Sequence, residues 1–277
     1  MKKYLIATAC DEKYEDFLLN HWYKSLKENV NLSETDILII DWGLSDSIKK
    51  KFDGALIFES KHKDEGLINN LRFMDLYDFL TNNPQYEQVA LCDGGDMIFQ
   101  SDISHLFTLK PSMVRGVTEK ISPNMEILIT NRKVKNADKI VNFFKDKNLI
   151  NVGFVVYPSK VFIQITERMF DLTLDKNAWG VDTILPNYLI YKSGFYEIDS
   201  KYNFIPTTSK RKFYIKNSTF YLANGEIIPI VHNAGNKDFF RSIRNFGYGP
   251  GHNKTKKVVM SVLRAFYEAL SFLRRKR

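Results

Sequence analysis

Apolar segments of two kinds alternate along the first hundred residues of the chain. Short runs of strand-forming residues are separated by longer segments whose apolar positions recur at helical spacing. Strands are expected at residues 4–10, 36–41, 55–58 and 89–92, and helices at 14–27 and 67–80. Strands that alternate with helices build a largely parallel sheet with right-handed crossover connections. The sequence therefore predicts an α/β fold with a mostly parallel central sheet.

The second half of the chain continues with shorter elements. Strands are expected at residues 113–117, 126–130, 150–157, 197–204, 213–215 and 227–232, and helices at 139–144, 161–170 and 182–191. Because of Pro186, the last helix either starts near Asp182 or is kinked. The chain has 277 residues, 44% of them hydrophobic, which suffices for a well-buried core, and no linker-like segment divides it. We expect one domain over residues 1–253, followed by a tail at 254–277.

Composition excludes several classes of protein. Cys10 and Cys92 lie in apolar, strand-like runs, which favours reduced, buried thiols over a disulfide scaffold. The apolar run after Lys2 and Lys3 ends before Asp11 and is too short for a secretory signal. The longest segment without a charged residue has 12 residues, whereas a membrane-spanning helix needs about 20 apolar residues. A cytoplasmic protein that does not cross a membrane is expected.

The positive charge is concentrated in the tail. Residues 254–277 contain eight lysines or arginines and one acid, so they carry +7 of the net charge of +8. A nucleic-acid-binding protein would spread basic residues over a folded face, so nucleic acid is not an expected partner. The apolar residues of the tail recur at three or four and predict an amphipathic helix: Val259, Val262, Leu263, Phe266, Leu270 and Leu273. Such a helix either lies on an anionic membrane surface or packs against the domain.

Two aspartates three residues apart follow the strand expected at 89–92. Asp93 and Asp96 would lie at the carboxyl end of that strand, where open α/β sheets bind their ligands. Gly94 and Gly95 have no Cβ atoms and would let a bulky ligand or a hydrated ion approach the backbone. One or two carboxylates, together with substrate phosphates, suffice to hold a divalent cation. The alternative is an ordinary Asp-Gly turn in which the glycines supply positive φ.

Three separate segments share a resemblance to one enzyme family. They are ACDEKY at residues 9–14, VALCDGGDMIFQSDISHLF at 89–107 and IVHNAGNK at 230–237. In this order they resemble the A-x-D-x-N-Y, Y-L-D-A-D-x-x-V-x-x-D-L and H-x-x-G-x-x-K-P-W segments of glycosyltransferase family 8, whose members have the GT-A fold. The resemblance covers about residues 4–240. It implies a single Rossmann-like GT-A domain that binds a nucleotide sugar.

The first segment would bind the nucleotide of the donor. The resemblance implies that the donor lies against Ala9, that Asp11 accepts a hydrogen bond from the uracil edge, and that Tyr14 stacks on the base. A carboxylate can accept the imide N–H, and a phenol ring offers a flat apolar face. Lys13 replaces the family's asparagine at the position implied for the ribose contact.

The second and third segments would hold a divalent cation and the diphosphate. The resemblance implies Asp96 and His232 as ligands of Mn²⁺ or Mg²⁺, with Gly235 and Lys237 at the diphosphate. Asp93 lies one place earlier than the family's first aspartate. It therefore either reaches the ion or ribose across a longer turn, or leaves Asp96 as the only aspartate bound directly to the metal.

Three weaker similarities lie between these segments. Arg72 stands where the family has an arginine that reaches the donor sugar and an aspartate of the metal motif. Asn151 and Gly153 match the family's N-A-G-V strand beside the sugar. Asp182 is the one residue that matches the D-Q-D-x-L-N segment, and Val181 replaces its glutamine. Asp182 is therefore a candidate base in an inverting enzyme or orients the sugar in a retaining one.

The function expected from these observations is metal-dependent transfer of a hexose from a UDP-sugar, most simply UDP-galactose or UDP-glucose. The acceptor would be a surface-glycan or lipid-linked saccharide at the inner face of the cell membrane, reached through the basic tail. One alternative is a sugar nucleotidyltransferase, although ATACDEKY lacks the glycine-rich loop typical of that class. Another is a membrane-binding or nucleic-acid-binding protein without enzymatic activity.

Overall fold

The computed structural model describes residues 2–120, 129–235 and 241–256, together with Val262, Ala265, Phe266, Glu268 and Ala269. Two expectations lie outside these residues: the role of Lys237 and most of the amphipathic pattern of the tail. None of the helices in the described part of the chain has the length and apolar character needed to cross a membrane.

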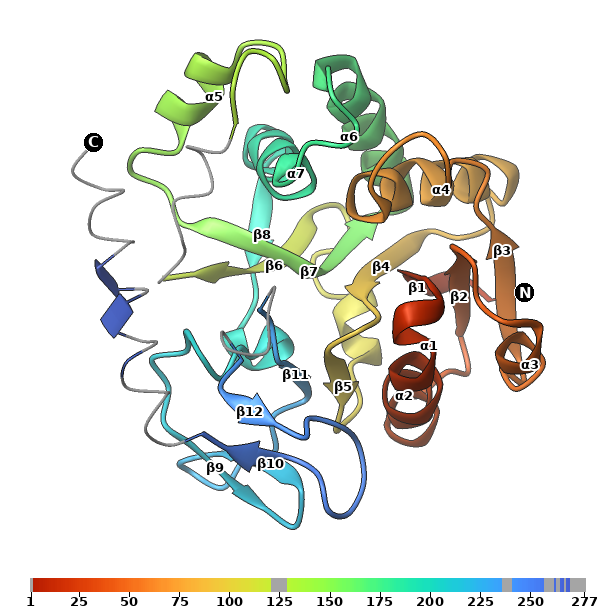
Figure 1. Cartoon of the computed structure of the whole chain (residues 1–277), viewed down its shortest axis with the longest axis vertical. Coiled ribbons are helices and arrows are strands. Elements are labelled where there is room, and N and C mark those ends of the chain that lie inside the picture. Colours follow the sequence, from red (N-terminus) through yellow and green to blue (C-terminus); the bar gives the residue numbers. More distant parts are fainter. Residues whose placement is uncertain are drawn as a thin grey trace.

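A seven-stranded sheet forms the centre of the protein, with the strand order β3-β2-β1-β4-β7-β6-β8 (Figure 1). The strands are β1 (Tyr4–Cys10), β2 (Thr35–Asp41), β3 (Ala55–Glu59), β4 (Gln88–Asp93), β6 (Val114–Glu119), β7 (Leu149–Pro158) and β8 (Phe195–Glu197). The first four strands in this order are parallel, and β6 and β8 are parallel to each other, whereas β7 is antiparallel to both its neighbours. The predicted α/β fold with a mostly parallel sheet is confirmed.

Helices cover the sheet on both faces. They are α1 (Glu15–Phe17), a π-helical segment (Leu18–Tyr23), α2 (Lys24–Asn29), α3 (Asp46–Lys49), α4 (Ile68–Asn82), α5 (Ala137–Phe143), α6 (Ser159–Leu172) and α7 (Val181–Ser193). In Figure 1, α4, α6 and α7 lie on one side of the sheet, and α1 and α2 lie on the other. The helices predicted within residues 1–253 are all present, and α7 begins at Val181 and continues past Pro186.

The alternation of side chains along the strands explains why two hydrophobic cores form. Successive strand residues point to opposite faces. In β1, Leu5 and Ala7 pack into the core under α4, α6 and α7, while Ile6 packs into the core that contains Trp22 and Leu26. Both faces of the central strands are therefore buried, as their continuous apolar runs require.

Three small antiparallel ribbons lie beside the central sheet in the described part of the chain. They pair β5 (Met97–Phe99) with β11 (Ile230–His232), β9 (Phe213–Lys216) with β10 (Thr219–Leu222), and β12 (Ile243–Arg244) with β13 (Lys254–Thr255). A third, smaller core joins them through residues such as Ile98, Phe220 and Val231. Since β5 follows β4 after three residues, this ribbon layer is attached directly to the end of a central strand.

Two of the predicted strands are wrong in whole or in part. Of the strand expected at 197–204, Glu197 is the last residue of β8, and Ser200–Asn203 form a short 3₁₀ helix instead. The Asp199 side chain caps this helix by accepting a hydrogen bond from the N–H of Lys201. In the segment 126–130, residues 126–128 lie outside the described ranges. Thr130 belongs to a turn, in which its carbonyl accepts hydrogen bonds from the N–H groups of Lys133 and Val134.

Candidate functional site

The candidate site lies at the carboxyl ends of β1 and β4, two central parallel strands. Ala9 of β1 is in register with Asp93, the last residue of β4. Asp11 follows β1 directly, and its Oδ1 atom is buried without a hydrogen-bond partner. Ligands of open α/β sheets bind at this edge. The fold therefore brings the first and second predicted segments together.

A short ribbon brings the third segment to the same place. β5 begins directly after Asp96 and pairs with β11, so that Met97 lies opposite His232. The N–H of Asn233 also donates a 2.9 Å hydrogen bond to the carbonyl of Asp96. Asp96 and His232 are therefore adjacent, although 136 residues of sequence separate them.

Asp93, Asp96 and His232 form one cluster of potential metal ligands. One ligand atom from each lies within 4.8 Å of the others. The Nε2 atom of His232 is 3.3 Å from Oδ1 of Asp96 and 3.5 Å from Oδ2 of Asp93. Carboxylate oxygen and imidazole nitrogen together suit borderline divalent ions such as Mn²⁺. The pairing of β5 with β11 thus places the histidine beside both aspartates.

Two arginines bind the outer oxygens of the carboxylates. Arg72 of α4 forms an ion pair with Oδ1 of Asp93, and Arg241 donates to Oδ2 of Asp96 at 3.0 Å. The Nε–H of Arg241 also donates to the carbonyl of Gly235 at 2.9 Å. Each aspartate therefore gives one oxygen to an arginine and turns the other towards His232. The inward oxygens and the Nε2 atom are three potential ligand atoms for a cation.

The charges in the cluster favour a cation at its centre. Burial raises the pKa of Asp93, but Arg72 and His232 outweigh this effect and the net shift is downward. Burial lowers the pKa of His232, but Asp96 and Asp93 raise it, and the net shift is upward. The two carboxylates therefore favour positive charge next to Nε2, which either a proton or a metal ion can supply.

Glycine at position 153 leaves space for the cluster. A Cβ atom there would lie 2.3 Å from Cε1 of His232 and 2.8 Å from Oδ2 of Asp93. These distances are far below van der Waals contact, so a side chain would displace two of the three potential ligands. Gly153 lies in β7, whose reversed direction brings its chain across the end of β4.

Gly94 and Gly95 make room for protein side chains, which differs from the expectation that they admit a ligand. Neither has positive φ, so the alternative of a glycine-dependent turn is not supported either. A Cβ at Gly94 would lie 2.6 Å from Oγ1 of Thr8, and one at Gly95 would lie 3.0 Å from Cδ1 of Tyr14. The absence of side chains here lets Tyr14, the expected base-stacking residue, pack directly on the turn between Asp93 and Asp96.

Asp182 lies beside the cluster at the first turn of α7. It is 7% exposed, and its N–H donates to Oδ1 of Asn70 at 2.9 Å. Burial raises the pKa of Asp182, and although Arg72 opposes this shift, the net direction is upward. Burial also disfavours the charged form of Arg72, but Asp93 and Asp182 outweigh it and hold the pKa of the guanidinium above its ordinary value. Arg72 therefore couples the two predicted functional aspartates electrostatically.

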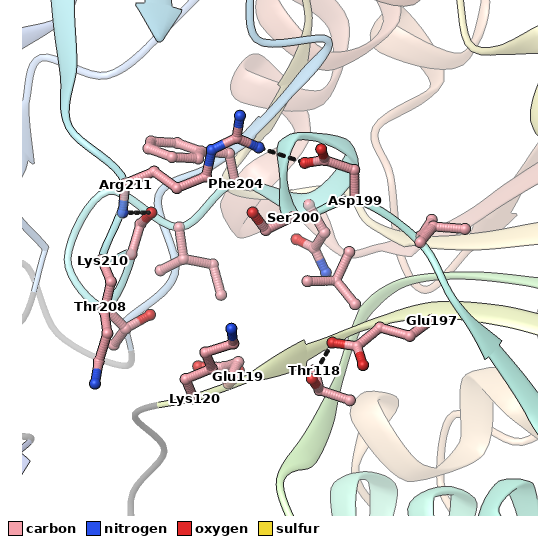
Figure 2. Close-up of a pocket in the computed structure, with 15 residues that line it drawn as sticks. Thr118, Glu119, Lys120, Glu197, Asp199, Ser200, Phe204, Thr208, Lys210 and Arg211 are labelled. Carbon is pink, nitrogen blue, oxygen red and sulfur yellow. Dashed lines mark hydrogen bonds and ion pairs between the residues drawn. The ribbon is translucent and has the colours of Figure 1, made fainter. Parts of the chain in front are cut away.

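A pocket of about 470 Å³, shown in Figure 2, is connected to the cluster through Asn203, which lines the pocket and contacts His232. Its wall combines apolar residues such as Phe204 with polar ones, which include Thr118, Glu119, Glu197, Asp199 and Asn203. Glu197 accepts a hydrogen bond from Thr118, and Asp199 pairs with Arg211 (Figure 2). The pocket can therefore offer hydroxyl-rich ligands both hydrogen-bond donors and acceptors.

The fold resembles that of a known glycosyltransferase. Among solved structures, the apo form of WbbM, described as a bifunctional glycosyltransferase, matches with a TM-score of 0.56 and 12% sequence identity. The match covers 100% of this chain and 52% of WbbM, so the chain spans about half the length of that protein. The chain has a glycosyltransferase fold. No family model matches the sequence, and no curated protein matches it significantly. Membership of family 8 stays a prediction.

Two residues of the site were not expected from the sequence. Asn203 holds the ring of His232, with Asn203 Oδ1 3.0 Å from His232 Nδ1, and Arg241 binds Asp96. Arg241 is one of several basic residues in the loop at 233–253, where the sequence singled out Lys237. Asn203 lies in a segment expected to be a strand, and no motif marks it. Only the tertiary fold identifies these two residues.

Proposed function

We propose that this protein is a metal-dependent glycosyltransferase that moves a hexose from a UDP-sugar, most simply UDP-galactose or UDP-glucose, to a saccharide acceptor. The observation that carries the proposal is the cluster of Asp93, Asp96 and His232 at the carboxyl ends of β1 and β4 in a glycosyltransferase fold. The acceptor is a surface-glycan or lipid-linked saccharide. Mn²⁺ or Mg²⁺ is the cation.

The residues of the cluster would hold the cation and balance the charge of the donor. When bound, a divalent ion stabilises the negative charge that develops on the leaving diphosphate. Asp93 Oδ2, Asp96 Oδ1 and His232 Nε2 are the ligand atoms available on the protein. Arg72 and Arg241 hold the carboxylates in place through their outer oxygens. Lys237 is a further candidate for the diphosphate.

The uridine would bind beside the cluster, at Ala9, Asp11 and Tyr14. The buried Oδ1 of Asp11 has no protein partner, and a uracil imide N–H can supply the missing donor. The half-buried ring of Tyr14 lies against Gly95 and offers the base a flat apolar surface. The base would then lie on Tyr14, which packs against Gly95, and the diphosphate would lie at Asp93 and Asp96. Both parts of the nucleotide would therefore be next to the turn between these two aspartates.

Asp182 and Arg72 would act on the sugar. The raised pKa of Asp182 suits a group that accepts a proton from an acceptor hydroxyl in an inverting reaction. In a retaining reaction the same carboxylate would orient the sugar through its hydroxyl groups. Asn151 and Gly153 border the space on the β7 side.

Titration calorimetry with UDP tests the proposal most directly. UDP is expected to bind in the presence of Mn²⁺, and excess EDTA is expected to remove that binding. Without the cation, the negative diphosphate would be repelled by the carboxylates of Asp93 and Asp96. UDP binding that is equal with Mn²⁺ and with EDTA would reject metal dependence. An assay of UDP-sugar hydrolysis over a panel of donors then identifies the sugar. A nucleotidyltransferase would instead consume a nucleoside triphosphate and a sugar phosphate.

The tail is proposed to bring the enzyme to the inner face of the cell membrane. Val262 and Phe266, which belong to the predicted apolar face, are 64% and 49% exposed. Exposed apolar residues within a segment of charge +7 favour shallow insertion into an anionic membrane surface.

Deleting residues 257–277 is expected to abolish co-sedimentation with vesicles that contain phosphatidylglycerol. This deletion spares the pairing of β12 with β13, which ends at Thr255, so UDP binding should be unchanged. The full-length double variant V262S/F266S keeps every charge and should also lose most of the binding, because the apolar contribution is removed. Sedimentation of the deletion variant at the wild-type level would refute membrane attachment through the tail.

A further inference from the structure

A chain of hydrogen bonds connects the wall of the pocket to the predicted metal ligand His232. The Nδ2 group of Asn151 donates to Glu119, which lines the pocket (Figure 2). Oδ1 of Asn151 accepts a 2.9 Å hydrogen bond from Nδ2 of Asn203. Oδ1 of Asn203 lies 3.0 Å from Nδ1 of His232. Three residues from β6, β7 and the 200–203 helix therefore link the pocket to the cluster.

Two contacts of Asn151 determine which groups donate and which accept along this series of hydrogen bonds. Glu119, when ionised, can only accept, so Asn151 must turn its NH₂ group towards it. The N–H of Gly153 donates to Oδ1 of Asn151 at 2.9 Å, which independently requires the same orientation of the amide. Asn203 must then present its NH₂ group to Asn151 and its oxygen to His232. Nδ1 of His232 is consequently the donor.

This direction determines which nitrogen of His232 is available to a metal ion. A neutral imidazole carries one proton, so a proton on Nδ1 leaves a lone pair on Nε2. Nε2 is the atom that faces Asp96 and Asp93 at 3.3 and 3.5 Å. His232 is 2% exposed and Asn203 is also 2% exposed, so water does not readily replace this contact.

We infer that Asn203, supported by Asn151 and Glu119, is a positioning residue that holds His232 in the Nδ1–H tautomer with Nε2 directed at the cation. The inference rests on the metal site of the proposed function and adds to it the residues that prepare the histidine. Partners of this kind orient metal ligands and raise their affinity for the ion. Because Glu119 lines the pocket, the hydrogen bonds from Glu119 through Asn151 and Asn203 also connect a ligand in the pocket to His232.

Two substitutions of Asn203 separate this role from simple packing. Asn203→Leu fills a similar volume but cannot accept from Nδ1, and it is expected to weaken Mn²⁺ binding about 10- to 100-fold. Asn203→Asp keeps an acceptor oxygen for Nδ1–H but loses the donor to Asn151, so it is expected to weaken Mn²⁺ binding about three- to tenfold, less than Asn203→Leu does. Mn²⁺ binding is measured without nucleotide, by electron paramagnetic resonance of the free ion. Nitrogen-15 NMR of His232 should show the Nδ1–H tautomer in the wild type and in Asn203→Asp only.

A pair of variants at the pocket wall provides the control. Glu119→Ala removes the carboxylate that accepts a hydrogen bond from Asn151. Glu197→Ala removes a carboxylate of the same wall that instead accepts a hydrogen bond from Thr118. Glu119→Ala should weaken Mn²⁺ binding about three- to tenfold, less than Asn203→Leu because it acts further from the metal, and Glu197→Ala should leave it unchanged. Glu197 is exposed and Glu119 is half-buried, whereas Asn203 is buried. This comparison therefore remains decisive if Asn203→Leu fails to fold.

The inference would be overturned if Asn203→Leu bound Mn²⁺ within twofold of wild type, or if Glu119→Ala and Glu197→Ala behaved alike. Asp96→Asn separates this failure from failure of the proposed function. If Asp96→Asn loses Mn²⁺ while Asn203→Leu retains it, the metal site stands and only the positioning role is wrong. If neither variant changes Mn²⁺ binding, the metal site itself is rejected.

Discussion

Asp96→Asn is expected to abolish Mn²⁺-dependent UDP binding and to lower glycosyl transfer about 10²- to 10³-fold, the loss typical when one preorganised electrostatic contact is removed. The substitution keeps the shape of the side chain and removes its charge. Oδ1 of Asp96 lies 3.3 Å from Nε2 of His232, and Oδ2 is held by Arg241. An amide oxygen at this position is a weaker ligand, and it leaves the charge of Arg241 uncompensated. Calorimetry with UDP and Mn²⁺ measures the binding, and a donor hydrolysis assay measures the rate.

Asp102→Asn is the matched control in the same stretch of chain. The Asp102 side chain accepts hydrogen bonds from the N–H groups of Asn31 and Ser104 and from the Ser104 hydroxyl, away from the cluster. Its substitution should cost about 1 kcal/mol of stability, as for loss of a capping side chain, and leave UDP binding unchanged. If Asp96→Asn binds UDP and Mn²⁺ as the wild type does, the assignment of this aspartate to the metal is wrong.

The central sheet could be predicted because its sequence signals are local. Each of the strands at 4–10, 36–41 and 89–92 is a short apolar run, and each is buried on both faces in the fold. The position of Asp93 and Asp96 at a carboxyl end then follows from strand direction alone. The reversed direction of β7 could not be read in the same way, because a buried strand has the same apolar pattern whether it is parallel or antiparallel.

The role of Asp93 shows where sequence spacing stops being informative. The resemblance left open whether an aspartate one place too early could reach the ion. In the fold, β4 ends at Asp93 and β5 starts at Met97, so the three residues between them turn the chain back towards His232. Both aspartates consequently turn an oxygen to the same imidazole nitrogen. The structure therefore places Asp93 in the cluster, a result that depends on the pairing of β5 with a strand more than 130 residues away.

Asn203 and Arg241 could not be predicted for a related reason. Their contacts with His232 and Asp96 are side-chain contacts between segments that are distant in sequence, and no local sequence pattern marks either residue. Gly153 is an intermediate case. The resemblance placed it in a strand beside the donor sugar, and the structure shows that the two groups nearest to its Cβ position belong to the predicted metal ligands His232 and Asp93.

Gly153→Ala adds a single methyl group, yet it is expected to weaken Mn²⁺ binding about 100-fold. This loss is at least as large as that expected when a contact that orients a metal ligand is removed. The new Cβ would lie 2.3 Å from Cε1 of His232 and 2.8 Å from Oδ2 of Asp93, so both ligands must move. Both are constrained, since Asn203 holds the His232 ring and Arg72 holds Asp93. Overpacking of this kind also costs about 1–3 kcal/mol of stability. Electron paramagnetic resonance of Mn²⁺ and thermal unfolding measure the two effects.

Gly95→Ala distinguishes a specific effect on the ligands from a general effect of substituting glycine near the cluster. Its Cβ would meet the ring of Tyr14 at 3.0 Å, and Asp93 and His232 are not among its three nearest contacts. We expect this variant to lose affinity for UDP, because the ring that is proposed to stack on uracil is displaced, while Mn²⁺ alone still binds within a few-fold of wild type. Two glycine-to-alanine substitutions would thus separate the nucleotide half of the site from its metal half. Equal loss of Mn²⁺ in both variants would contradict this division, and wild-type Mn²⁺ affinity in Gly153→Ala would show that the cation does not bind between Asp93 and His232.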